Sequence, residues 1–413
     1  MENKKSDFRT VGEFEPQSSV LIGWPLVQYP KNNRQLNTDA VSVELVKHLC
    51  GQVRILIFCY NNDVINRSKH NLLEANIEIN EIEFLVYPSE FMYPRDFGAE
   101  IMINDSGEKQ LVNFDFNLYG LFSDMPIADK YKKFARFHAE HSGITKTVET
   151  KLISEGGDRE FNGQGVMLTI EETEVNKRNP LWNKDDIEKE FKNIFNLQKI
   201  IWLPQAAFDD EHMFSGPIPD ENNNFTAYRS ASANGHIDEI CRFVNENTIL
   251  IAHITEEESQ KSVLAKLNKD RLDKAYKVLT ESANADGKYF NIIKIPVPEP
   301  IYLNIEPGDN IHKAFQTGYE VFNGKMIDGS IFPTGLMKVL PALSYCNFLI
   351  CNNKVIAQKY YREGMKVEVK QKDAEALSVL KNIFPGKEVV TIDTIALNIY
   401  GGGIHCNTRN IPV

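Results

Sequence analysis

Residues 398–413, NIYGGGIHCNTRNIPV, end the chain with three glycines, a histidine and a cysteine within a few positions of one another. The termini of domains usually fray, and a frayed end is a poor place for ordered chemistry. The stretch is therefore either an irregular tail or the sign of a fold that draws its C-terminus into its centre. The ends of the other strand-like runs favour the second interpretation.

Four strand-like runs lead into a conspicuous polar group. IEFLVYPSEFMYPRD reaches Asp96, TKTVETKLISEGGD reaches Glu155 and Asp158, and VVTIDTIALNIYGGGIHC reaches Cys406. The fourth run, QKIIWLP, precedes a loop that ends in NGHIDE. Repetition of such units suggests a quasi-repetitive fold with one shared centre, where the glycines permit sharp turns and close backbone approach.

The motif GHIDE is the most informative of these polar groups. In an extended segment His236 and Asp238 are two positions apart and point to the same face, so both can meet one ligand. Each motif alone also has a structural explanation, since RD is often a surface ion pair and EGGD is often a turn. The occurrence of all of them in one chain favours a functional site.

Composition and charge restrict the class of protein. The 413 residues are 42% hydrophobic and 25% charged, as in ordinary globular proteins, and the net charge of −11 argues against nucleic acid or an anionic membrane as partner. An acidic chain is compatible with a cationic substrate. Neither an apolar run of membrane-spanning length nor the apolar core of a signal peptide is present, so we expect a cytoplasmic protein.

The six cysteines do not predict a metal site. They include no CxxC and no Cys/His cluster at zinc spacing, so we expect no metal site. For the five cysteines other than Cys406, a buried thiol in a reducing compartment is the default expectation.

Short β-rich runs alternate with amphipathic helical stretches from end to end, which predicts a mixed α/β fold. Turn sequences at 105–107, 245–247 and 352–353 predict hairpins, so a purely parallel sheet fits poorly. Because no linker divides the chain, we expect a single domain over 1–413. Residues 209–234 lack a clear periodicity and are predicted to form a long loop, which acts as a lid or an insertion.

The sequence resembles the agmatine deiminase and bacterial peptidylarginine deiminase family of guanidine-modifying enzymes. The resemblance extends from about Phe8 to Cys406 and rests on FRTVGEFEPQSSVLIGWP, YPRDFGAE, VNFDFNLYG, SEGGDREFNGQGVMLTIEETEVNKRNP, GHIDEICRFVNENTILIA, LPALSYCNFLICNNKVIA and GGGIHCNT. It implies the pentein fold, a five-bladed, pseudo-fivefold α/β propeller of ββαβ-type units around a central active-site channel. Such a fold explains why the end of the chain carries chemistry.

The resemblance also implies a role for each site residue. Cys406 matches the nucleophile, His236 the general acid and base, and Glu155 the acidic partner of that histidine. The substrate-binding set is expected to be Asp96 and Asp238, which match the aspartates that hold the guanidinium, together with Tyr93 and Arg95. An ordinary histidine pKa near ~6.5 suits the two roles of His236. His405 is expected to be structural.

Hydrolysis of agmatine to N-carbamoylputrescine and ammonia, through a covalent S-alkylthiouronium on the cysteine, is the expected reaction. Bacterial peptidylarginine deiminases bind the substrate carboxylate with arginines shortly after the RD hairpin, whereas residues 113–126 here, NFDFNLYGLFSDMP, contain no Arg or Lys. A substrate without a carboxylate is therefore favoured, although Arg229 or Arg409 offers an alternative anion site.

Other outcomes stay open at this point. The substrate can be arginine, peptidylarginine or another guanidine, and an amidinotransferase would use the same residues with an amine as acceptor. A catalytically silent pentein that only binds a partner is a further alternative, but such members lack the Cys and HxD set. A homo-oligomer is compatible with the sequence, which does not reveal the oligomeric state.

Overall fold

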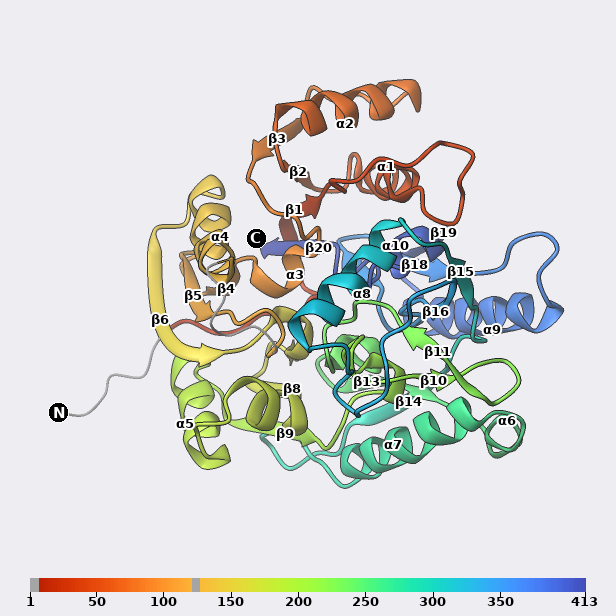
Figure 1. Cartoon of the computed structure of the whole chain (residues 1–413). Helices are drawn as coiled ribbons and strands as arrows, with labels where there is room; N and C mark the ends of the chain where they lie inside the picture. Colours follow the sequence, from red (N-terminus) through yellow and green to blue (C-terminus); the bar gives the residue numbers. More distant parts are fainter. Residues whose placement is uncertain (1–6, 121–126) are drawn as a thin grey trace.

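The computed structural model describes residues 7–120 and 127–413, and within them five sheets share one pattern of strand pairing (Figure 1). Their strands are β1 (Gln17–Gly23), β2 (Arg54–Cys59), β3 (Ile82–Val86), β4 (Glu100–Ile103), β5 (Lys109–Asp115), β6 (Lys146–Ile153), β7 (Glu160–Phe161), β8 (Val166–Ile170), β9 (Lys199–Leu203), β12 (Cys241–Asn245), β13 (Thr248–His253), β14 (Asn291–Pro296), β17 (Leu349–Cys351), β18 (Lys354–Lys359), β19 (Glu388–Asp393) and β20 (Thr408–Pro412). In each sheet one strand pairs antiparallel with one neighbour and parallel with the other.

These strands form the sheets β20–β1–β2–β3, β4–β5–β6, β7–β8–β9, β12–β13–β14 and β17–β18–β19. The hairpins predicted at 105–107, 245–247 and 352–353 are confirmed, because β4–β5, β12–β13 and β17–β18 are antiparallel neighbours in the chain. The mixed α/β class and the rejection of a purely parallel sheet are confirmed as well.

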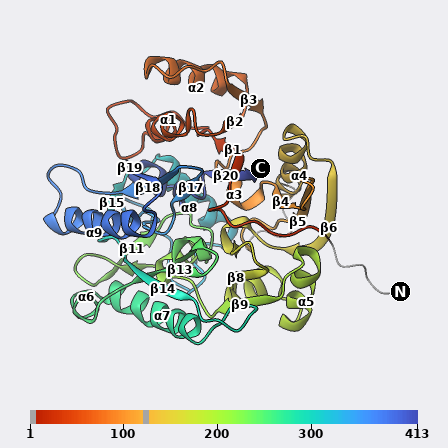
Figure 2. The ribbon, with the colours of Figure 1, turned by 180° about the vertical axis from the view of Figure 1, so that it is seen from behind.

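The helices lie mainly outside the sheets (Figures 1 and 2). They are α1 (Thr38–Leu49), α2 (Asn62–Glu74), α3 (Pro94–Phe97), α4 (Ala128–His141), α5 (Lys184–Phe195), α6 (Glu256–Lys261), α7 (Val263–Thr280), α8 (Asn310–Val321), α9 (Val367–Ile383) and α10 (Ile395–Asn398). Helix α5 illustrates how the sequence specifies them: Ile187, Phe191 and Phe195 recur every four residues and are buried on one face, while the Asn183 side chain caps the first turn.

A sixth sheet corrects the prediction of a long loop at 209–234. This segment contains β10 (Ile218–Pro219) and β11 (Phe225–Arg229), which join β15 (Leu303–Ile305) and β16 (Met337–Leu340) in the order β10–β11–β16–β15. Both strands of the segment are short, and β11 pairs with a strand more than 100 residues later. Local periodicity carries no information about such a distant partner, so the prediction of an unbroken loop was wrong.

The C-terminus is not an irregular tail. Strand β20 pairs antiparallel with β1, and the Val413 N–H donates a hydrogen bond of 3.0 Å to the Pro16 carbonyl. One detail of the prediction was wrong: the strand-like run 389–400 ends as a strand at Asp393, and helix α10 leads on to the glycines. The element that precedes the glycines and Cys406 is therefore a helical turn and not a strand.

We expect that removal of residues 408–413 destabilises the protein although it spares Cys406. The change exposes the edge of β1 and removes Ile411, which is buried, at a cost of about 5 kcal/mol from lost burial and ladder hydrogen bonds. Thermal unfolding measures the effect, and removal of the exposed Val413 alone is the control. An unchanged midpoint after the longer deletion would contradict the role assigned to β20.

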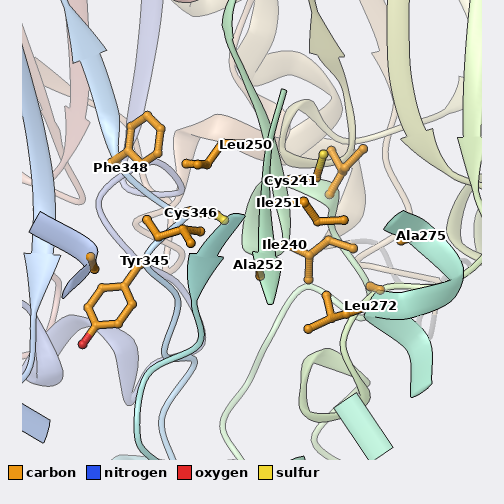
Figure 3. Close-up of a cluster of buried hydrophobic side chains, with 14 of the residues drawn as sticks. Ile240, Cys241, Leu250, Ile251, Ala252, Leu272, Ala275, Tyr345, Cys346 and Phe348 are labelled. Carbon is orange, nitrogen blue, oxygen red and sulfur yellow. The ribbon is translucent and has the colours of Figure 1, made fainter. Parts of the chain in front are cut away.

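The largest buried cluster lies around β12, β13 and the segment before β17 (Figure 3). It includes Cys241 and Cys346, and both thiols are fully buried. Of the five cysteines expected to be buried free thiols, four are buried and Cys50 is half-buried, and all are unpaired. None of the helices in the described part of the chain is both long enough and apolar enough to cross a membrane.

Candidate active site

Four separate segments bring the predicted polar groups together. Asp96 lies in α3, Glu155 precedes the 3₁₀ turn η1 (Gly156–Asp158), His236 precedes the 3₁₀ turn η4 (Ile237–Glu239), and Cys406 follows α10. Asp238 lies within η4 itself. These side chains are buried, and the distances given below place them around one point. The sequence pattern of strand-like runs followed by polar groups therefore predicted a real cluster.

His236 lies between two carboxylates. Its Nε2 is 3.4 Å from Glu155 Oε2 and its Nδ1 is 3.5 Å from Asp96 Oδ1, while its backbone N–H donates to Asp210 Oδ2 at 2.7 Å. Burial lowers the pKa of His236, but the charges of Asp96, Glu155 and Asp238 outweigh burial and raise it to about 10. The expectation of an ordinary pKa was therefore wrong, because the surrounding carboxylates come from distant segments.

The raised pKa predicts a pH dependence of stability. Protonation of His236 stabilises the folded state fully below its ordinary pKa near ~6.5, and this contribution is lost as the pH rises towards about 10. We expect the thermal midpoint to fall more steeply between pH 7 and pH 10 in the natural protein than in a His236→Gln variant. Parallel curves for the two proteins would contradict the raised pKa.

Cys406 is surrounded by groups that keep its thiol protonated in the free protein. Its Sγ accepts a hydrogen bond from Asn347 Nδ2 at 3.1 Å and lies 3.8 Å from Asp238 Oδ2 and 3.7 Å from Glu239 Oε1. Burial and these carboxylates raise the pKa of Cys406 well above the ordinary thiol value. A cation placed among the carboxylates would reverse the electrostatic part of this effect.

Asp238 is oriented by His405. Its Oδ2 lies 2.6 Å from His405 Nδ1, and the other ring nitrogen lies 2.7 Å from Glu13 Oε2. The His405 ring therefore links Asp238 to Glu13. Against the effect of burial, this contact lowers the pKa of Asp238, which leaves its buried Oδ1 ionised and without a partner among the described residues.

Asp96 is fixed by Tyr119 and by the backbone of η1. The Tyr119 hydroxyl donates to its Oδ2 at 3.0 Å, and the Gly157 N–H donates to its Oδ1 at 3.2 Å. A Cβ atom on Gly157 would lie 2.5 Å from His236 Nδ1 and 2.9 Å from Asp96 Oδ1. The EGGD motif therefore needs glycine here because two functional side chains approach its backbone closely.

Gly401 serves a similar purpose before the cysteine. Its φ of +100° lies in the region that favours glycine, and a Cβ there would lie 1.8 Å from the Ala231 carbonyl oxygen. The loop that carries His236 and the loop that carries Cys406 are therefore packed backbone to backbone.

Glu155 is held by a fully buried arginine. Arg178 ends the π-helix η2 (Glu172–Arg178), and its Nε donates to both Glu155 oxygens at 2.7 and 2.8 Å. Its other nitrogens donate to the carbonyl oxygens of Tyr119 at 3.0 Å and Ala233 at 2.6 Å. Burial opposes ionisation, but Arg178 holds the pKa of Glu155 below its ordinary value. Arg178 thus connects three loops of the site.

Tyr93 lies close to Cys406, whereas the Arg95 side chain is bonded to other groups of the protein. The Tyr93 ring is close to Cys406, since a Cβ on Gly402 would lie 2.9 Å from both residues, and the hydroxyl donates to Leu397 O at 3.0 Å. Arg95 donates to His405 O, Glu13 Oε2 and Asn410 Oδ1 at 2.9–3.1 Å. Because these acceptors engage the Arg95 guanidinium within the protein, they argue against the predicted contact between Arg95 and a substrate.

The two arginines considered as alternative anion sites are also paired. Arg229 contacts Glu211 at 3.3 Å, and Arg409 contacts Glu100 at 2.7 Å. Both side chains are buried in these ion pairs, which does not favour either as a site for a substrate carboxylate.

Several site residues escaped the sequence analysis. Glu239 and Asn347 contact the thiol, Tyr119 contacts Asp96, and Arg178 and Glu13 hold other site residues. Glu239 and Asn347 stand inside quoted motifs, and a lone Asn in the apolar run SYCNFLI was an available signal. The partners of Arg178 and Glu13 depend on tertiary contacts and had no local signal.

One group of atoms has the spacing of a metal site. Ligand atoms of Asp238, Glu239 and Cys406 lie within 4.8 Å of one another. Two of these groups, Asp238 and Glu239, are the carboxylates next to the thiol of the third, and a bound organic cation would satisfy their charge equally well. The expectation of an enzyme without a metal therefore stays a prediction.

Known proteins match the chain over nearly its full length. A family model described as Porphyromonas-type peptidyl-arginine deiminase matches residues 9–217 and 225–412. Agmatine deiminase of Pseudomonas aeruginosa (strain LESB58) is 27% identical over 98% of this chain and 95% of its own length, and the putative agmatine deiminase of Marinomonas sp. (strain MWYL1) is 25% identical over 98% and 94%.

Solved structures match the fold. Agmatine deiminase of Enterococcus faecalis superposes with a TM-score of 0.73 at 22% identity, covering 100% of this chain and 98% of that chain. A putative arginine deiminase from Porphyromonas gingivalis gives a TM-score of 0.69 at 20% identity, covering 98% of both chains. The family model and these structures point to one group of proteins, and the buried cluster can be interpreted in the light of that group.

Proposed function

Because the chain belongs to the Porphyromonas-type peptidyl-arginine deiminase family, whose members hydrolyse carbon–nitrogen bonds of linear amidines, we propose that it deiminates agmatine through Cys406. The products are N-carbamoylputrescine and ammonia. The observation that carries the proposal is the meeting of Cys406, His236, Glu155, Asp96 and Asp238 in one buried cluster.

The carboxylates of Asp96 and Asp238 hold the guanidinium of the substrate. A guanidinium is planar and presents adjacent N–H groups, so two fixed carboxylates can orient its plane through charge-assisted hydrogen bonds. Asp238 Oδ1 is buried and has no partner among the described residues, so it is free to accept a hydrogen bond from the guanidinium. The bound cation lowers the pKa of Cys406 and so favours the thiolate.

The reaction then proceeds through a covalent intermediate. The thiolate attacks the central carbon, the protonated His236 gives its proton to one nitrogen, and the C–N bond breaks to release ammonia. The neutral His236 takes a proton from water, which attacks the S-alkylthiouronium carbon. The adduct then loses the proton of its new hydroxyl to solvent while the C–S bond breaks, which releases the ureido product and regenerates the thiolate. A histidine with a raised pKa is protonated at neutral pH, as the first step needs.

Agmatine is favoured over substrates that carry a carboxylate. The Pseudomonas aeruginosa relative is named an agmatine deiminase and the Marinomonas relative a putative one. Residues 113–126 contain no Arg or Lys, although 121–126 lie outside the described residues. The described site is rich in carboxylates, which would repel a carboxylate on the substrate. Peptidylarginine, arginine or another guanidine is the alternative that the family description and the Porphyromonas neighbour support.

An assay of ammonia and ureido product with agmatine, arginine, arginyl peptides and simple guanidines tests the proposal. Agmatine should give the highest kcat/KM, and ammonia should appear without an added amine, which an amidinotransferase would require. If no guanidine reacts, the proposal fails and a silent binding protein becomes the better explanation.

We also infer that the five sheets of shared pairing are the blades of a pseudo-fivefold propeller, with the described cluster in its central channel. In each of the five sheets one strand has an antiparallel neighbour on one side and a parallel neighbour on the other, which supports this arrangement. A single domain, with 209–234 and its sheet as an insertion, and a cytoplasmic enzyme without cofactor complete the proposal.

A further inference from the structure

Two adjoining cavities share part of their lining, and the inner one is lined by Glu239, which lies close to Cys406. The inner cavity has a volume of about 40 Å³, and Ile240, Ala252, Leu272 and Tyr345 are among its walls (Figure 3). A cavity of this size holds a few water molecules. It also has Glu239 in its lining.

The outer cavity is a groove of about 720 Å³ between α6, α7 and α9. It shares a set of lining residues with the inner cavity, so the two cavities adjoin. The shared residues are Asp209, Asn268, Val297, Pro298 and Leu343.

Glu239 joins the inner cavity to the nucleophile. Its Oε1 is 3.7 Å from Cys406 Sγ and accepts from Asn347 Nδ2 at 3.0 Å. Whereas Cys406 and Asp238 are buried, Glu239 is half-buried, so solvent reaches it. From these contacts we propose that the two cavities form a passage for ammonia and water to and from Cys406, separate from the entrance of the substrate. The inference rests on the proposed deiminase function.

The chemistry requires such exchange while the site is occupied. After the C–N bond breaks, the remainder of the substrate stays bonded to Sγ and fills the route by which it entered. Ammonia then has to leave and one water has to arrive. Tyr119, which is half-buried and bonded to Asp96, lies at a different part of the site, and we assign the entrance of the substrate to that side.

The charges along the passage suit a small cation. In the described part of the chain, Asp209, Asp210 and Glu239 line the inner cavity and no Lys or Arg does. Ammonia that takes up a proton becomes ammonium, which acidic walls attract. The outer groove is mixed, with six acidic and three lysine side chains among its lining residues.

Narrowing the inner cavity should slow the second half of the reaction. Ala342 lines it and is half-buried, so Ala342→Leu fills space in the cavity that Glu239 also lines. With agmatine, or whichever guanidine the natural protein turns over best, we expect kcat to fall about tenfold, with kcat/KM unchanged. The thiouronium adduct on Cys406 should accumulate and be detected as added mass in acid-quenched protein.

Matched variants separate this effect from damage to the fold. Ala265→Leu makes the same change in the roomy outer groove and should leave the kinetics unaltered. Ala342→Val fills less space and should give an intermediate effect if Ala342→Leu does not fold. A rise in KM at constant kcat would assign the cavity to the substrate and overturn the proposal, as would unchanged kinetics or a loss of kcat without adduct. Failure of the natural protein on every guanidine would instead refute the deiminase function.

Discussion

Replacement of Cys406 by serine is expected to reduce turnover by about 10⁴-fold or more while leaving the thermal midpoint nearly unchanged. The thiol makes one short hydrogen bond, from Asn347 Nδ2, and its other polar neighbours are carboxylates 3.7 and 3.8 Å away. A serine hydroxyl fits this space, but its far higher pKa prevents the alkoxide from forming even with a guanidinium beside it. The loss is therefore chemical and not structural.

Steady-state assays and mass spectrometry measure this prediction. The natural protein should show a covalent adduct when a reaction with substrate is quenched in acid, and Cys406→Ser should show none. Cys50→Ser is the matched control, because Cys50 is half-buried and lies outside the site. Turnover by Cys406→Ser within tenfold of the natural protein would refute the nucleophile assignment.

Replacement of Arg178 by methionine is expected to lower the free energy of unfolding by about 3–5 kcal/mol and also to impair turnover. Arg178 and Glu155 are both fully buried, so loss of the guanidinium leaves the carboxylate in the interior with His236 in place of a bidentate arginine partner. It also removes the hydrogen bonds to Tyr119 O and Ala233 O that connect the loops around His236. Glu155 will respond by taking up a proton, which removes a charge that raises the pKa of His236.

Chemical denaturation and pH profiles test this effect of Arg178. Arg136→Met is the matched control, because Arg136 pairs with Glu149 on the surface, where such pairs contribute at most about 1 kcal/mol. Arg178→Lys keeps the charge but cannot make all the bonds of a guanidinium, so it should recover part of the stability. If Arg178→Met is as stable as Arg136→Met, the buried pair does not have the role assigned to it.

Local sequence patterns predicted the elements that are specified by their own residues. The hairpin turns at 105–107, 245–247 and 352–353 carry their own turn residues, and helix α5 carries both its cap and its apolar face. The cluster of Asp96, Glu155, His236 and Cys406 could be expected because each group follows a strand-like run.

What the sequence could not predict depends on partners far along the chain. Strands β10 and β11 are recognisable only through β16, and the pKa of His236 depends on carboxylates about 80 and 140 residues away. His405 was expected to be structural, and its ring links Glu13 to Asp238, which are far apart in the chain. The run 389–400 misled because all four residues of α10 are buried and three of them are apolar, as in a buried strand.

The pairing of β20 with β1 has a consequence for how the protein folds. Strand β1 gains its antiparallel neighbour only when residues 408–412 have reached it, although most of the chain separates the two strands. Contacts of such large sequence separation are typical of slow folding, so we expect the pairing of β20 with β1 to slow the folding of this chain.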